Sequence, residues 1–140
     1  MAIRKIPTNT STFNFYNANP KDKRTADCVV RALSLFLDKT WEEVMEGLFE
    51  VAMKNKLMLN DKACYKKYLK NLGYEMIKQP RKSDNTKYTG VEFCKRIADS
   101  NKLYLAHIGG NHIVCIKDKK VNDIWNSTEG CIGNLWVRMV

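Results

Sequence analysis

The sequence predicts an α+β domain in which N-terminal helices pack on a C-terminal antiparallel β-meander. Apolar residues recur at helical spacing from Cys28 to about Ser100, and from Leu103 they form extended runs separated by polar or glycine turns. A length of 140 residues corresponds to one domain. We expect an N-terminal arm over residues 1–20 and a single domain over residues 21–140.

Composition narrows the class of protein. Hydrophobic residues make up 44% of the chain and charged residues 28%, as in an ordinary soluble domain. No apolar run is long enough for a bilayer, and no signal segment opens the chain. The five cysteines are odd in number and lack C-x-x-C spacing, which argues against a disulfide framework or a zinc ribbon. We therefore expect a cytoplasmic protein with reduced thiols and no membrane partner.

The first 37 residues predict an arm followed by a buried helix. The arm lacks helical periodicity, and Phe13–Tyr16 is expected to dock it onto the body. Thr25 or Asp27 is a suitable N-cap for a helix that begins at Cys28. This helix is apolar almost all round, which is typical of a buried helix.

Three more helices are expected before the sheet. The capping-box patterns Thr40–Glu43 and Thr89–Glu92 open helices that extend to about residues 52 and 100. Between them, a helix begins at residue 60 or 61 and stops at Gly73, a favourable residue after a helix C-terminus. A short strand is expected over Tyr74–Ile77.

The C-terminal part predicts four strands. Gly109-Gly110 is typical of a two-residue hairpin turn, which makes His107 and His112 cross-strand partners. The predicted strands are Leu103–Ile108, Asn111–Ile116, Val121–Asn126 and Leu135–Val140.

Cys28 and His112 are the residues best suited to chemistry. A helix N-terminus presents unpaired N–H groups and partial positive charge, and both stabilise a thiolate. The same N–H groups can bind an oxyanion. A neutral imidazole beside a thiol can accept its proton and later protonate a leaving group.

The strand after His112 offers two candidates for a third residue. A three-residue loop pairs His112 with Asn126, whose amide oxygen can orient the imidazole. A two- or four-residue loop instead opposes His112 to Trp125 and places Asp123 diagonally on the same face. Asp123 is therefore the reserve orienting residue.

This order resembles the papain-like cysteine peptidases. In that family a cysteine opens a central helix, a histidine follows on an antiparallel strand, and an Asn or Asp stands on the next. The chain is also similar to small papain-like proteins of phages and prophages of Gram-positive bacteria. The matching segments are Asn17-Ala18-Asn19-Pro20, Asp27-Cys28-Val29-Val30-Arg31-Ala32 and Asn111-His112. The resemblance implies a thiol hydrolase acting on a peptide, isopeptide or amide bond without a cofactor, in the host cytoplasm if it is phage-encoded.

One position departs from the family pattern. Six residues before the nucleophile the family usually has a glutamine that donates to the oxyanion, and this chain has Asp22. The backbone N–H of Cys28 supplies one donor, and Asn17 or Asn19 is the candidate for the other.

A metal site and nucleic-acid binding are less favoured by the sequence. His107, His112 and a cysteine suggest zinc, but no further ligand stands at suitable spacing, so no metal is expected. The 24 basic residues exceed the 15 acidic ones, yet they are spread over turns and helix faces, so nucleic-acid binding is not favoured. The alternative to a hydrolase is a non-catalytic, phage-encoded binding module or inhibitor that acts on a host protein or nucleic acid.

Overall fold

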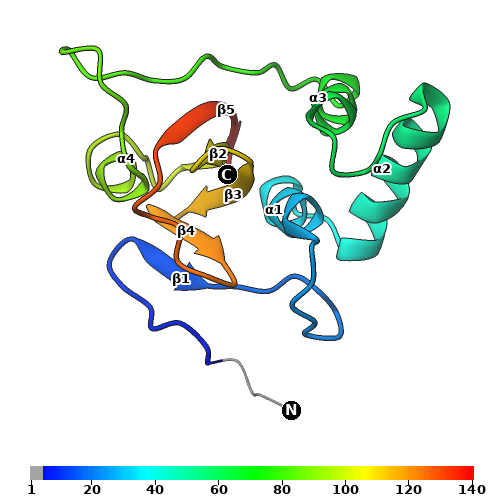
Figure 1. Ribbon diagram of the computed structural model, residues 1–140, viewed down its shortest axis with the longest axis horizontal. Helices are drawn as coiled ribbons and strands as arrows, with labels where there is room; N and C mark the ends of the chain where they lie inside the picture. The colour runs from blue at the N-terminus through cyan, green and yellow to red at the C-terminus, as the bar shows by residue number, and fades with distance from the viewer. Residues whose placement is uncertain (1–4) are drawn as a thin grey trace.

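A computed structural model describes residues 5–140 (Figure 1). These residues form four helices and a five-stranded mixed sheet, which confirms the predicted α+β class. The helices are α1 Cys28–Leu37, α2 Trp41–Asn55, α3 Lys62–Asn71 and α4 Gly90–Arg96; the strands are β1 Phe13–Phe15, β2 Lys102–Ile108, β3 His112–Lys117, β4 Lys120–Asp123 and β5 Ile132–Met139.

The sheet has the strand order β1-β4-β3-β2-β5. Strands β2, β3 and β4 form the predicted antiparallel meander. The last strand does not continue it, because β5 pairs with β2 at the opposite edge. The arm adds β1, which runs parallel to β4 and fully buries Phe13. The docking expected for Phe13–Tyr16 is therefore confirmed, and the arm makes the sheet mixed, because β1 is its one parallel strand among residues 5–140.

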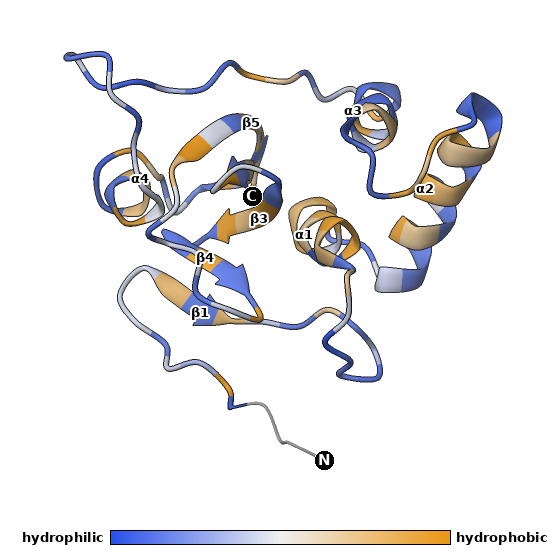
Figure 2. Cartoon of the chain, viewed as in Figure 1, coloured by the Kyte–Doolittle hydropathy of each residue, from blue (hydrophilic) through white to orange (hydrophobic). Residues whose placement is uncertain are grey.

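Helices cover both faces of this sheet. Helix α1 packs on β3, with α2 and α3 outside it, and α4 lies on the opposite face (Figure 1). Leu103 and Leu105 of β2 belong to the cluster around α1, whereas Tyr104 and Ala106 belong to the one around α4. Because α1 lies between the sheet and two helices, its surface is apolar almost all round, as Figure 2 shows.

Some predicted boundaries differ. Both capping boxes form, and Gly73 follows α3 with a φ of 93°. Tyr74–Ile77 is not a strand, since only Ile77 bridges to Leu135. Helix α4 ends at Arg96, and β4 ends at Asp123 rather than Asn126. No helix within residues 5–140 is long and apolar enough to cross a membrane.

The β2–β3 hairpin corrects the pairing of the two histidines. Its loop has three residues, Gly109–Asn111, so His107 pairs with Ile113 and His112 pairs with Ile108. Both glycines have positive φ, 59° and 99°, which suits residues without a Cβ. The expected two-residue turn is therefore wrong, and His107 and His112 are not partners.

The first residue of α4 gives a stability prediction. A Cβ added at Gly90 would lie 2.8 Å from the carbonyl oxygen and 2.9 Å from the Cα of Thr128. Because these are backbone atoms, we expect Gly90→Ala to destabilise the protein by about 1–2 kcal/mol in urea denaturation. Lys95→Ala, at an exposed position of the same helix, is the control. A Gly90→Ala variant as stable as this control contradicts the prediction.

Candidate active site

Cys28 is the first residue of α1, and its side chain is partly exposed. Asp27 occupies the N-cap position, but its side chain makes no capping hydrogen bond to the N–H groups of the first turn. Its carboxylate instead accepts from Arg31. The N–H groups of the first turn therefore keep their partial positive charge at the end of the helix that carries the thiol.

His112 is the first residue of β3, directly after the glycine loop. Its Nε2 lies 2.5 Å from Oδ2 of Asp123. Burial lowers the pKa of His112, but hydrogen bonds to Asp123 and to Cys28 outweigh it and raise the pKa to about 9. Because Nε2 is engaged by Asp123, Nδ1 is the ring nitrogen left for the Cys28 sulfur. The imidazole is thus bonded to a carboxylate and lies close to a thiol.

A buried arginine joins the two carboxylates of the site. Nε of Arg31 donates to Oδ1 of Asp27 at 2.7 Å, and Nη1 donates to Oδ1 of Asp123 at 2.7 Å. All three side chains are at most 7% exposed. Charge-assisted hydrogen bonds that are shielded from water hold the relative positions of these side chains strongly. Arg31 therefore links the residue preceding Cys28 to the residue that holds His112.

Two further side chains fix Asp27. Its Oδ2 accepts from Nε1 of Trp41 at 2.9 Å and from Nδ2 of Asn19 at 3.3 Å. The carboxylate thus accepts hydrogen bonds from the first residue of α2 and from the loop before α1. The network therefore ties both flanking segments to the start of α1.

Trp125 flanks the imidazole from the solvent side. The ring centroids of His112 and Trp125 are 4.9 Å apart, and the indole is about half exposed. An indole in this position limits the access of water to the His112 ring. A hydrogen bond shielded from water, such as that between His112 and Asp123, is stronger than one exposed to solvent.

The predicted orienting residue Asn126 does not reach His112. It is exposed, and its Oδ1 accepts from the backbone N–H and the hydroxyl of Thr128, at 3.0 and 2.6 Å. The β3–β4 turn has two residues, so Lys117 pairs with Lys120. Asn126 would lie opposite His112 only if this turn had three residues. The geometry instead selects the reserve residue, Asp123.

Asn19 supports the loop before α1. Its Oδ1 accepts from the N–H groups of Lys21 and Lys23, while its Nδ2 points to Asp27. Asn17 likewise donates to the carbonyl of Lys23. With both amide groups committed to this loop, the backbone N–H of Cys28 is the oxyanion donor that the geometry offers.

His107 belongs to a separate cluster. Its Nε2 lies 2.5 Å from the hydroxyl of Tyr65, and its ring packs edge-on against Trp136. Burial and the nearby Lys62 lower the pKa of His107, so its imidazole is neutral at pH 7. Within residues 5–140, no group of three His, Cys, Asp or Glu side chains is placed to hold a metal ion.

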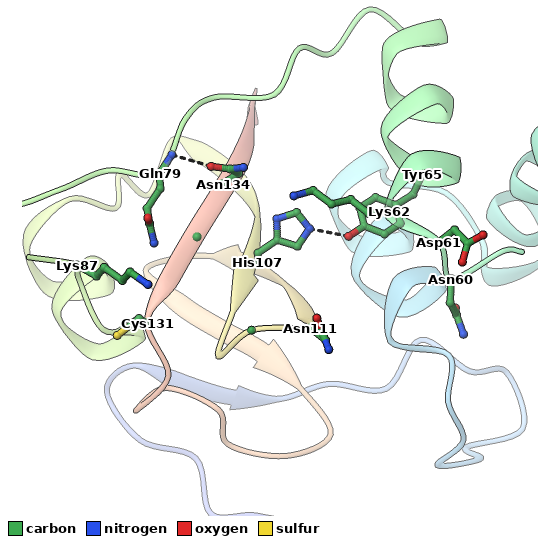
Figure 3. A pocket seen from close by; sticks show the side chains of 12 residues that line it. Asn60, Asp61, Lys62, Tyr65, Gln79, Lys87, His107, Asn111, Cys131 and Asn134 are labelled. Carbon is green, nitrogen blue, oxygen red and sulfur yellow. Dashed lines mark hydrogen bonds between the residues drawn. The ribbon is translucent and has the colours of Figure 1, made fainter. Parts of the chain in front are cut away.

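A cavity of about 530 Å³ adjoins the site (Figure 3). Asn111, which precedes His112, lines it, as does Tyr65 of α3. Other lining residues come from the start of α3, the segments around Gln79 and Lys87, and β5. Cys28 and His112 are not part of the lining, and the cavity approaches them through Asn111.

Sequence reasoning missed Arg31 and Trp41 as parts of the site. A signal for Arg31 was available, because it is the only charged residue in the apolar run Cys28–Leu37. A charge in a buried helix requires a partner, and Asp27 stands four residues before it. Trp41 carried no such signal, since its spacing fits an ordinary core residue.

Comparisons of the chain with protein-family models, with curated proteins and with solved structures give no match. The fold and the geometry of the site therefore carry the functional proposal.

Proposed function

We propose that the protein is a thiol-dependent hydrolase with a papain-like Cys-His-Asp site, acting on a peptide, isopeptide or amide bond. Cys28 is the nucleophile, His112 transfers the proton, and Asp123 orients His112. One observation carries the proposal: the His112 imidazole is hydrogen-bonded to the Asp123 carboxylate, and the Cys28 thiol is close enough to raise the pKa of His112. This is the nucleophile–base–orienting-group arrangement that covalent catalysis requires.

The reaction proceeds in two steps. The Cys28 thiolate attacks the carbonyl carbon, and the oxyanion is stabilised by the backbone N–H of Cys28. The His112 imidazolium then protonates the leaving amine as the C–N bond breaks, which leaves an acyl-thioester. A water molecule gives its proton to His112 and attacks this thioester, so that the C–S bond breaks and a carboxylic acid departs.

Asp123 and Arg31 set the charge state of the histidine. Asp123 accepts a hydrogen bond from Nε2 of His112 and stabilises the imidazolium, which favours a thiolate beside it. Arg31 binds the other carboxylate oxygen, so Asp123 is shared between two cations. The carboxylate is thereby held in one orientation.

The same proposal includes a peptide or protein substrate and a reducing, cytoplasmic compartment. All five cysteines are free, which agrees with a reducing environment. The similarity to phage-encoded papain-like proteins extends the proposal to the cytoplasm of a bacterial host, with a host protein as the possible target.

Alkylation by iodoacetamide tests the nucleophile. Cys131 is exposed and Cys28 is only partly exposed, so accessibility alone makes Cys131 react faster. We expect Cys28 to react at least tenfold faster than Cys131 at pH 7, because the thiolate is the reactive form. Peptide mapping by mass spectrometry follows both sites in one sample. Equal rates, or a faster Cys131, refute the hydrolase and leave a non-catalytic binding module.

Two variants separate the candidates for the orienting residue. Asp123→Asn removes the carboxylate at His112, and we expect Cys28 alkylation to slow about tenfold. Asn126→Ala removes a side chain whose hydrogen bonds within residues 5–140 go to Thr128, so the rate is expected to stay within twofold of wild type. The reverse ranking assigns the orienting role to Asn126.

A further inference from the structure

The cavity beside Cys28 presents positive charge. Lys62, at the start of α3, and Lys87, before α4, extend toward its centre from opposite sides (Figure 3). Among residues 5–140, no carboxylate lies within ion-pair distance of either ammonium group. Two unpaired ammonium groups facing one space favour an anion between them.

The acidic residue in the lining does not offset this charge. The Asp61 carboxylate accepts from the backbone N–H of Met58 at 3.0 Å, and Figure 3 shows it turned away from Lys62 and His107. Tyr65 and His107 supply the buried part of the wall. Burial raises the pKa of Tyr65 to about 12, and it lowers that of His107. Both groups are therefore neutral at pH 7, and the wall adds no negative charge.

The polar groups of the wall are also fixed in place. The hydroxyl of Tyr65 donates to Nε2 of His107, because the other ring nitrogen is bonded to the backbone of Asn134. The side chain of Asn134 accepts from the N–H of Gln79 at 2.9 Å, as Figure 3 shows. A wall held by such bonds is preorganised and loses little entropy when a ligand binds.

Three observations place the cavity near Cys28, although Cys28 is not part of its lining. Asn111 is adjacent to His112 in sequence and lines the cavity. Burial is the main cause of the raised pKa of Tyr65, and the nearby Cys28 adds to it. Asn60, another lining residue, donates to the carbonyl of Ala26, two residues before Cys28. We therefore expect a chain whose carbonyl lies at Cys28 to reach this cavity with a neighbouring side chain.

We propose that this cavity binds a carboxylate of the substrate, so that the enzyme selects peptides with a glutamate or aspartate next to the bond that it cleaves. The inference rests on the proposed hydrolase function. A volume of about 530 Å³ lies within the range of small-molecule sites and exceeds what one acidic side chain needs.

Binding of matched peptides tests the inference without turnover. The full-length Cys28→Ser variant is titrated with acetylated, amidated hexapeptides of alanine and glycine that carry one Glu or one Gln at each position in turn. We expect the best Glu peptide to bind at least fivefold more tightly than its Gln counterpart, and the preference to shrink in 0.5 M salt. Equal affinities at all positions overturn the inference.

Charge variants locate the preference. The double variant Lys62→Gln/Lys87→Gln is expected to abolish it, whereas Lys95→Gln, on an exposed part of α4 outside the cavity, retains it. Inorganic phosphate is the competitor that tests for a general anion site. If phosphate displaces the Glu peptide and the position of the Glu is immaterial, the substrate subsite is overturned.

The two proposals fail in different ways. Fast iodoacetamide alkylation of Cys28 together with equal Glu and Gln affinities overturns the acidic preference and leaves the hydrolase standing. Slow alkylation with a retained Glu preference refutes the hydrolase and turns the cavity into a binding site for an acidic partner. Fast alkylation with a Glu preference that depends on Lys62 and Lys87 supports both.

Discussion

Replacing Arg31 with methionine is expected to lower the free energy of unfolding by about 3–5 kcal/mol. The substitution keeps most of the side-chain volume and removes the guanidinium that pairs with Asp27 and Asp123. Both carboxylates are then buried without their shared cation. Asp27 keeps its bonds from Trp41 and Asn19, and Asp123 keeps His112, so we expect a destabilised protein that still folds.

The matched control is Arg138→Met. Arg138 donates one hydrogen bond to the carbonyl of Phe36 at 3.2 Å and has no carboxylate partner among residues 5–140. Its loss is expected to cost about 1 kcal/mol. Urea denaturation followed by circular dichroism measures both variants. Equal effects of the two substitutions mean that the buried network contributes no more than an ordinary arginine bond.

The sequence predicted the positions of Cys28 and His112 because both depend on local signals. Asp27 before an apolar run predicted a helix that begins at Cys28, and the change to extended runs placed His112 at the start of a strand. Helix capping and hydrophobic periodicity act over a few residues, so they can be read from the chain.

The third residue depended on a turn that lacks a local signal. Asp118 and Lys119 both have positive φ, 53° and 60°, as in a type I′ hairpin. Aspartate is common at the first of these positions, but Lys119 stands where such turns favour glycine. Without a glycine there, the sequence did not distinguish a two-residue from a three-residue loop between β3 and β4. The shorter loop changes the register by one residue and replaces Asn126 by Asp123 near His112.

The pairing of the two edge strands, β1 and β5, could not be predicted from local sequence patterns. Strand β5 returns to β2, where Trp136 becomes fully buried, and β1 joins β4 from more than a hundred residues away in sequence. Such pairings are selected by the burial of side chains on both faces and leave no spacing signal in either strand. The two lysines of the cavity come together for the same reason, from segments 25 residues apart in sequence, 62 and 87.

Stability is expected to fall between pH 6.5 and about 9.5 because of His112. Its pKa is about 9 in the folded protein, after hydrogen bonds to Asp123 and Cys28 overcome burial, and about 6.5 in an unfolded chain. A raised folded pKa means that the stabilisation is complete below pH 6.5 and is lost as the pH rises through 9. Allowing for partial solvent screening, the loss is about 2 kcal/mol. Urea denaturation at a series of pH values measures it.

The second histidine provides the control for this titration. His112→Gln removes the titrating group, so its stability is expected to be lower at pH 6.5 and to fall less steeply up to pH 9.5 than that of the wild type. His107→Gln also loses a buried hydrogen bond, to Tyr65, but the pKa of His107 lies below 6.5, so this variant keeps the slope of the wild type. The difference between wild type and each variant cancels the ionisation of the four cysteines other than Cys28. If His112→Gln retains the wild-type slope, the imidazolium is not held between Cys28 and Asp123, and the charge arrangement of the site is refuted.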